Sequence, residues 1–269
     1  MKRPTLLGAT VAIALSAFGW GQKGHDTTAY IAEQHLTPAT AAAVDSIFDG
    51  KSIVYWSNWL DNASHQPDLK YTKTWHYKNV DADETYETAQ ANPSGDAVTA
   101  IKAQVETLSD PATKLKDSQL ALKILVHVMG DLHMPLHMGH ASDLGGNRIK
   151  VKFFGRDNNL HSIWDSSLPE AAHKWSYSEW QQQIDRINQA TADAIISGSV
   201  DDWAKETVAI ASKVYTYFQP GINVSYNDIA RWTPTIEEQF LKGGLRLAHT
   251  LNLIYDPEYR AAYLSNSGD

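Results

Sequence analysis

The sequence of 269 residues contains no cysteine. Disulfide bonds are therefore excluded, and so is any metal site built on thiolate ligands. A metal bound by this chain must be held by nitrogen and oxygen donors alone. Bound metal can then take over part of the cross-linking that disulfides provide in other proteins.

The sequence also lacks an apolar run long enough to cross a bilayer, which takes about 20 residues. Its best candidate, Leu6 to Ala17, is shorter and follows the basic start Met1-Lys2-Arg3. A basic start, a short apolar run and the small residues of Ala17-Phe18-Gly19 are typical of a secretory signal. We therefore expect a signal peptide over residues 1–19 and cleavage that leaves Trp20 first. The mature protein should be secreted or periplasmic and carry no membrane anchor.

Basic residues are few, since 23 Lys and Arg stand against 31 Asp and Glu, for a formal charge of -8. Removal of Lys2 and Arg3 with the signal would make the chain more negative still. Most nucleic-acid-binding proteins carry the opposite, basic footprint. A cluster of divalent cations would reverse the field locally, so an anionic substrate remains compatible with this composition.

What the sequence does contain is histidine and aspartate at the spacing of metal ligands. His127 with Asp131 and His161 with Asp165 form two His-x-x-x-Asp pairs, and His137 lies between them. On a helix this spacing puts both side chains on one face. Imidazole nitrogen and carboxylate oxygen both suit zinc. A single His on an apolar helical face is more often a hydrogen-bonded core residue, but two pairs with a third His indicate a polynuclear metal site.

Apolar periodicity through the rest of the chain predicts an all-α fold, mostly helical and forming a single domain. The one β-like segment alternates Ile149, Val151 and Phe153, which predicts a short β-hairpin near residues 147–156, after Gly145-Gly146. Cap residues and periodicity predict helices over 38–48 after Thr37, 97–108 after Ser94, 120–131, 178–194 from Ser178, 199–218 from Ser199, and 233–254 from Thr233-Pro234.

Conspicuous blocks occur in a fixed order along the chain: Trp20-Gly21 with His25, Trp59-Leu60-Asp61, Trp75-His76-Tyr77, His127-Val-Met-Gly-Asp131, Pro135-Leu136-His137, Asp143-x-Gly145-Gly146-Asn147, Asn159-Leu160-His161, Trp164-Asp165 and Gly244-Leu-Arg246-Leu247-Ala248. In these blocks the chain resembles the zinc-dependent, single-strand-specific type I nucleases, whose fold is shared with bacterial zinc phospholipase C. The resemblance covers nearly the whole expected mature chain. It implies that residues 20–269 form one zinc-dependent nuclease domain of a bacterial-type member.

The resemblance also implies a cluster of three Zn2+ per chain. The implied ligands are Asp61, His76 and His127 for the first zinc; His25 with the free amine and carbonyl oxygen of Trp20 for the second; Asp131 as a bridge between these two; and His137, His161 and Asp165 for the third. Asp61 and Asp131 are the expected catalytic carboxylates. His133 and His140 are close in sequence to these ligands and are candidates for orienting them.

The implied reaction is hydrolysis of single-stranded DNA and RNA to 5′-mononucleotides, with 3′-nucleotides as further substrates. A hydroxide bridging two zincs would attack phosphorus, since zinc lowers the pKa of bound water to about 7, and the third zinc would stabilise the departing 3′-oxygen. Tyr77 would stack on an unpaired base. Asn79, where fungal members have Asp, and Asn147 are further expected substrate contacts. Ser64 stands where a basic residue is common. We expect a monomer.

The main alternative function is that of a phospholipase C acting on phosphatidylcholine-type lipids with the same zinc core. The nuclease is favoured because the third-site carboxylate is Asp165, where the lipases use Glu. The long segment between His137 and His161, which carries Gly-Gly-Asn, also favours it. A non-enzymatic zinc protein is less favoured, because closed structural sites would not need a bridging carboxylate.

Overall fold

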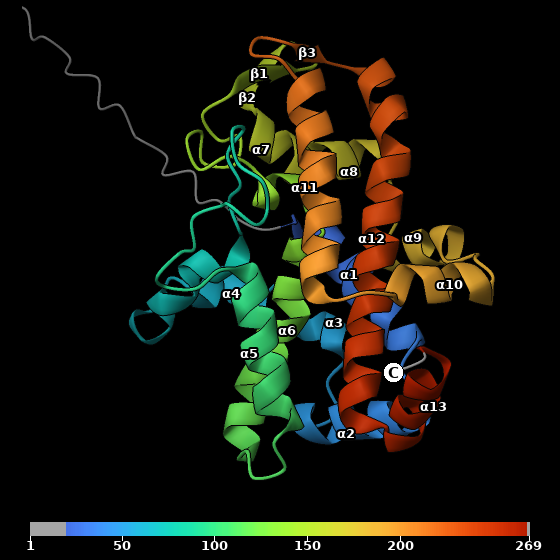
Figure 1. Cartoon of the computed structure of the whole chain (residues 1–269). Coiled ribbons are helices and arrows are strands. Elements are labelled where there is room, and N and C mark those ends of the chain that lie inside the picture. Colours follow the sequence, from blue (N-terminus) through green and yellow to red (C-terminus); the bar gives the residue numbers. More distant parts are fainter. Residues whose placement is uncertain (1–19, 268–269) are drawn as a thin grey trace, which may run out of the picture.

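Two long helices organise the fold (Figure 1). Helix α6 spans Leu115–Leu132 and α12 spans Tyr226–Tyr255. Helix α5, Ala97–Ser109, packs along α6, whereas α1, Gln22–Gln34, packs along α12 and also contacts α6. The structure is a computed structural model that describes residues 20–267, with side chains to residue 265. The expected signal peptide, residues 1–19, lies outside the described residues.

The remaining helices surround this frame, and all but one of them are shorter than α6. They are α2 (Pro38–Phe48), α3 (Ile53–Trp56), α4 (Trp59–Ala63), η1 (Pro67–His76), η2 (Pro135–Met138), α7 (Leu160–Ser162), η3 (Ile163–Ser167), α8 (Leu168–Ala172), α9 (Tyr177–Ile184), α10 (Gln189–Ile196), α11 (Val200–Tyr217) and α13 (Pro257–Ser267). The prediction of a mostly helical chain is confirmed. Among the described residues no helix is both long and apolar enough to cross a membrane.

The predicted hairpin forms slightly later in the chain than expected. Strands β1 (Lys150–Phe153) and β2 (Arg156–Asn159) pair antiparallel, with Lys150 opposite Asn159. Phe154 and Gly155 connect them with φ values of 49° and 77°. Two central residues with positive φ match the right-handed twist of a hairpin. A third strand, β3 (Asn223–Val224), pairs parallel with β1, although no alternation of apolar residues predicts it.

Helix starts were predicted well where one cap residue dominated. Thr37 accepts a hydrogen bond from the Thr40 N–H and Pro38 opens α2, as expected. Ser199 caps α11 through a reciprocal pair with Asp202. Both starts follow local chemistry, because a short polar side chain can satisfy backbone N–H groups that the helix leaves unpaired.

Several predicted helix boundaries were wrong. Helix α6 begins at Leu115 rather than at residue 120, and Ser176 rather than Ser178 caps α9. Asp96, not Ser94, caps α5. The helix expected over 178–194 is two helices, because the chain leaves helical geometry at Asp185 and Asn188 caps a new start. The helix expected from Thr233-Pro234 begins at Tyr226, where Ser225 and Asp228 form a capping box, and Pro234 lies inside it. An earlier cap and burial of α12 therefore outweigh the local cost of an interior proline.

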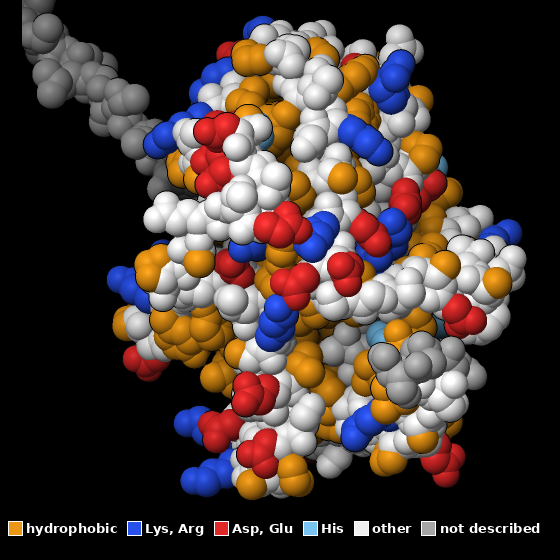
Figure 2. Space-filling model, in the orientation of Figure 1, with side chains coloured by type: hydrophobic (Ala, Val, Ile, Leu, Met, Phe, Trp, Pro, Cys, Tyr) orange, Lys and Arg blue, Asp and Glu red, His pale blue; other side chains and the backbone are white. Residues whose placement is uncertain are grey.

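The interior holds two apolar clusters. One, which includes Leu122, Leu125 and Val128, lies around α5 and α6. The other is rich in aromatic residues, with Trp20 at 4.9 Å from Phe240 between ring centroids and Trp164 at 5.2 Å from Trp232. The abundant tryptophans therefore serve mainly as core. On the face drawn in Figure 2, acidic and basic side chains are interspersed, without a large area of one sign.

Candidate metal centre and substrate pocket

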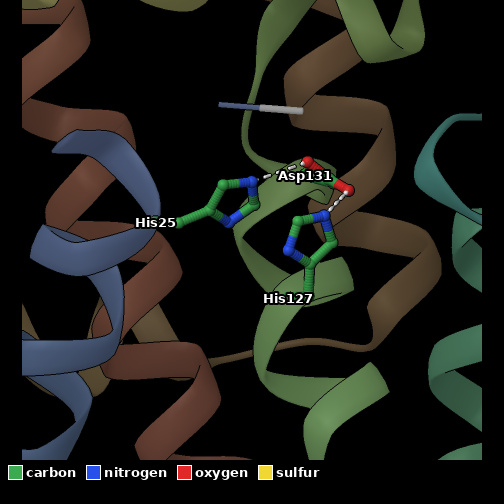
Figure 3. Close-up of side chains that lie close together, drawn as sticks. All are labelled: His25, His127 and Asp131. Carbon is green, nitrogen blue, oxygen red and sulfur yellow. Dashed lines mark ion pairs between the residues drawn. The ribbon is translucent and has the colours of Figure 1, made fainter. Parts of the chain in front are cut away.

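Asp131 lies at the centre of a buried group of histidines. His127 and Asp131 are one turn apart on α6, and His127 Nε2 lies 3.1 Å from Asp131 Oδ2. His25 approaches from α1, with its Nε2 3.3 Å from the other carboxylate oxygen, Oδ1 (Figure 3). The two imidazole rings stack with centroids 4.0 Å apart. One carboxylate thus joins donors from two helices.

The close approach of α1 and α6 depends on Gly130. A Cβ at this position would lie 2.9 Å from His25 Nδ1, which is too close for any other residue without movement of the histidine. The glycine in the His127-Val-Met-Gly-Asp131 block therefore makes room for a ligand from another helix.

A second group shares His127 with the first. Asp61 comes from α4 and His76 ends η1; Asp61 Oδ1 lies 3.3 Å from His127 Nε2, and His76 Nδ1 lies 2.9 Å from Asp131 Oδ2. His127 Nδ1 donates to the backbone carbonyl of Ser57 at 2.7 Å, which turns its Nε2 toward the carboxylates. Such an orienting hydrogen bond is a usual feature of a metal-binding imidazole.

These donor atoms form two candidate metal groups, namely His25, His127 and Asp131, and Asp61, His76 and His127. Within each group all donor atoms lie within 4.8 Å of one another. The predicted third set, His137, His161 and Asp165, does not meet that distance among the described residues, although its members lie nearby. His137 Nδ1 is 3.4 Å from Asp131 Oδ1, and the rings of His137 and His161 stack with centroids 5.3 Å apart.

Several donor atoms of these residues are buried without a hydrogen bond. Both ring nitrogens of His25, Nε2 of His76 and one carboxylate oxygen each of Asp131 and Asp165 have no hydrogen-bond partner. Buried polar atoms are normally paired, because desolvation without a partner costs free energy. Every one of these atoms is a suitable zinc donor. The donor set therefore fits a group of metal ions.

The electrostatics of the site lead to the same conclusion. Burial alone would lower the pKa of His127, but the charges of Asp131 and Asp61 raise it well above its ordinary value. Burial also opposes ionisation of Asp131, yet the neighbouring histidines hold its pKa well below the usual range. Burial, reinforced by Asp61 and Asp131, raises the pKa of Asp165 well above normal. Carboxylates this crowded and buried need positive charge beside them, which divalent cations supply.

Trp20 lies next to this region. Its side chain is buried against Phe240, and the N–H of Gly21 donates to the carbonyl oxygen of Asp165 at 2.9 Å. In the intact chain the nitrogen of Trp20 belongs to a peptide bond with Gly19. The free amine predicted as a ligand therefore exists only after cleavage at that bond.

A cavity of about 340 Å³ opens beside the histidines. Its lining includes all three predicted substrate contacts, Tyr77, Asn79 and Asn147. Three predicted metal ligands also line it, namely His76, His137 and His161. The other lining residues, for which no role in substrate binding was predicted, are Leu136, Leu144, Gly145 and Arg148. The position of Leu144 directly before Gly145-Gly146-Asn147 could have indicated that it lines the pocket. Its side chain is 54% exposed although apolar, which suits a ligand-facing wall.

Backbone geometry explains why Tyr77 and Asn79 face the cavity together. After His76 the chain becomes extended, and the N–H groups of Lys78 and Val80 donate to the carbonyls of His137 and Gly139 at 2.9 and 3.1 Å. Successive side chains of an extended segment point to opposite sides, so residues two apart share a side. The alternate pair Tyr77 and Asn79 therefore lines the pocket.

Another part of the wall comes from the loop that follows Asp143, which contributes Leu144, Gly145 and Asn147. Gly145 has φ 61°, and a Cβ there would lie 2.6 Å from the carbonyl oxygen of Leu136. Asp143 Oδ1 accepts hydrogen bonds from the Gly146 N–H and the Tyr215 hydroxyl at 2.6 and 2.9 Å. His161 Nδ1 donates to the Gly145 carbonyl at 2.7 Å. The same loop thus shapes the pocket and orients a predicted ligand.

His133 and His140 have other contacts than the expected ones. His133 Nδ1 donates to the Met129 carbonyl, and its Nε2 accepts from Arg246 on α12 at 3.0 Å, so it links α6 to α12. His140 stacks on Tyr215, and its Nδ1 lies 3.5 Å from Asp143 Oδ2 at the start of the Gly-Gly-Asn loop. Ser64 is buried and donates to the Asp61 carbonyl at 3.2 Å.

A larger cavity, of about 540 Å³, lies elsewhere, between α1, α10 and α12. None of the predicted metal ligands lines it, and His35 Nε2 lies 2.8 Å from Asp185 Oδ2 in its wall. The smaller cavity is the one that adjoins the candidate metal groups.

A family model described as S1/P1 Nuclease matches residues 20–256. The chain belongs to the S1/P1 nuclease family. It is 31% identical to Nuclease P1 of Penicillium citrinum over 89% of this chain and 99% of that protein. It is 29% identical to Nuclease S1 of Aspergillus oryzae, with 91% and 95% covered, and 28% identical to Endonuclease 4 of Arabidopsis thaliana, with 91% and 92% covered.

Membership of the S1/P1 nuclease family confirms three predictions from the sequence. The resemblance to nucleases extends over about the same residues as expected, the helical fold is that of the family, and the chain is a hydrolase. The relatives named above come from fungi and a plant, so they give no support to the narrower expectation of a bacterial-type member.

Proposed function

We propose that this S1/P1 nuclease is a zinc-dependent phosphodiesterase that cleaves single-stranded DNA and RNA to 5′-mononucleotides and removes 3′-phosphate from nucleotides. One observation carries the proposal. Two His/Asp groups share the buried His127, and one of them reaches, through His76, a cavity of about 340 Å³ that has Tyr77 in its wall. A charged centre for phosphate thus lies next to a surface for a base.

The ligands proposed for three Zn2+ follow from the donor sets. Asp61, His76 and His127 would hold one ion, Asp131 would be shared with a second ion held by His25 and Trp20, and His137, His161 and Asp165 would hold a third. The third set is supported by the burial of Asp165 and by its raised pKa. A cation bound beside this carboxylate would stabilise its ionised form. When bound, zinc would supply an activated water and positive charge for the phosphate and the departing 3′-oxygen.

The side chains of the pocket would select the substrate. Tyr77 offers a half-buried ring on which a base can stack, and stacking tolerates any base. A base held in a duplex cannot enter without losing its own stacking, which favours single strands. Asn79 presents both a donor and an acceptor to a base edge, and Asn147 lies in another part of the wall. Asp61 and Asp131 would act by holding the cations at fixed positions beside the phosphate.

The test is to incubate the purified protein separately with single-stranded DNA, single-stranded RNA, duplex DNA, a 3′-nucleotide and phosphatidylcholine vesicles. We expect hydrolysis of both single strands to products with 5′-phosphate, release of phosphate from the 3′-nucleotide, slower cleavage of duplex and no release from lipid. Cleavage of phosphatidylcholine with no cleavage of nucleic acid would overturn the proposal in favour of the phospholipase alternative.

We also propose that the protein is secreted and acts as a monomer starting at Trp20. The family match begins at this residue, directly after the small residues of the expected cleavage site. Sequencing the amino terminus of protein recovered from outside the cytoplasm tests the cleavage, and its mass in solution tests the oligomeric state.

A further inference from the structure

Arg148 is the only lysine or arginine among the residues that line the substrate pocket. It directly follows the Gly145-Gly146-Asn147 turn and is exposed. Its Nη1 donates to the carbonyl of Ser142 at 3.0 Å, which holds the guanidinium near the loop. Within the described part of the chain Arg148 forms no ion pair with a carboxylate. A cation without an acidic partner therefore stands at the edge of the proposed base site.

The other side of the pocket has the opposite charge. A neighbouring cavity of about 310 Å³ shares Tyr77 and Asn79 with the pocket and is lined by Asp81, Glu84 and Asp96. The one lysine there, Lys78, is already paired with Asp96 at 3.3 Å. Like charges repel, so a polyanionic strand leaving the pocket would avoid this side. The positive charge of Arg148 favours a path of the strand past this residue.

The chemistry of cleavage identifies which phosphate would meet Arg148. Water adds to phosphorus as the bond to the 3′-oxygen breaks; the new P–O bond leaves a 5′-phosphate on the departing fragment, and the 3′-oxygen takes up a proton. A 3′-nucleotide, the smallest of the proposed substrates, has a single nucleoside, which carries the reacting phosphate on its 3′ side. We place this nucleoside in the pocket, with its 3′-phosphate toward the histidines. In a longer strand, the only other phosphate of this nucleoside is on its 5′ side.

We infer that Arg148 binds the phosphate on the 5′ side of the nucleotide whose base occupies the pocket, and so favours phosphorylated oligonucleotides over substrates that lack this group. The inference rests on the proposed nuclease function and names the substrate class of the same site. A guanidinium suits this role, because its planar donors match phosphate oxygens in pairs.

The experiment compares kcat/KM for a thymidine dinucleotide with and without a 5′-phosphate, using zinc-loaded protein expressed from the full chain. We expect the 5′-phosphate to raise kcat/KM about tenfold at low salt, and less at high salt because exposed charge pairs are screened. Arg148→Gln should reduce this ratio to about one, and Arg148→Lys should retain part of it. Zinc content should stay the same in every variant.

Arg186→Gln is the matched control. Arg186 is also exposed, and its Nε donates to one backbone carbonyl, that of Gln182, at 2.8 Å, but it lies outside the pocket. The variant removes the same charge and should keep the tenfold ratio. A wild-type ratio near one, or an equal loss on both dinucleotides in Arg148→Gln, would overturn the inference while leaving the proposed function intact. Failure of the zinc-loaded protein to cleave either dinucleotide or longer single strands would overturn both.

Discussion

The candidate metal centre and the substrate pocket lie side by side but are built differently. The centre takes His25, His127 and Asp131 from α1 and α6, and each is at most 1% exposed. The pocket takes its distinctive residues from an extended segment and a loop, where Leu144 is 54% exposed. Helices with buried contacts hold donor atoms accurately, whereas loops can change without disturbing the core. Under the proposed function, the chemistry would take place in the rigid part and the substrate would be selected by the adaptable part.

The largest effect should come from removing the metal from the buried centre. Elemental analysis should give about three zinc ions per chain, and a strong chelator should abolish hydrolysis. The melting temperature should fall by at least roughly 5 °C, because the crowded carboxylates Asp61, Asp131 and Asp165 lose the cations that bind only the folded state. Full activity with one equivalent of zinc, or with magnesium alone, would exclude the three-zinc centre.

Asp131→Asn tests the residue at the middle of the centre. The amide keeps the shape but loses the charge that faces His25, His76, His127 and His137, so kcat/KM should fall by roughly 10³-fold or more. The control is Asp157→Asn, whose side chain is 92% exposed and contacts Lys152. That variant should stay within about twofold of wild type. Similar losses in both would show that the centre is assigned to the wrong residues.

The amino terminus tests whether Trp20 belongs to the zinc ligands of the buried centre. A free α-amine has a pKa of about 7.7–8.0 and can lose its proton to bind zinc, but an amide nitrogen is a poor ligand at neutral pH. Protein that retains residues before Trp20 should therefore bind about one zinc fewer and turn over substrate more slowly than protein that starts there. Equal zinc content and equal turnover in the two forms would remove Trp20 from the ligands.

Tyr77→Ala moves the test to the pocket. Base stacking contributes about 1–3 kcal/mol, so kcat/KM for single strands should fall between roughly fivefold and a hundredfold. Zinc content should not change, because the neighbouring His76 keeps its contact with Asp131. A loss of zinc together with activity would mean that the two regions are not separable in the way proposed.

The smallest effect is expected for Asn79→Asp. The carboxylate loses the amide donor but keeps an acceptor, so the relative rates on the four bases should change by a few-fold while the rate averaged over bases changes little. Measurement on homopolymers of each base would detect the shift. An unchanged preference would exclude Asn79 from base recognition.

Part of the candidate metal centre could be read from the sequence because two of its residues come from one helix. His127 and Asp131 share a face of α6 by spacing alone, and their block also carried the glycine that admits α1. Helix starts with one dominant cap, such as Thr37 and Ser199, were equally local. The start of α12 was not, because the strong Thr233-Pro234 signal competed with the capping box at Ser225.

The sequence by itself determined the chemistry that this chain can carry: a thiol-free set of imidazole and carboxylate donors on mostly helical segments, with a Gly-Gly-Asn turn between His137 and His161. Only the tertiary structure decided how those donors meet, because the contact of His25 with Asp131 and that of His76 with Asp131 join residues far apart in the chain. It also decided that Arg148 faces the pocket and that carboxylates line the neighbouring cavity. Spacing along a chain fixes neighbours within one helix, but a contact between elements depends on how whole faces pack.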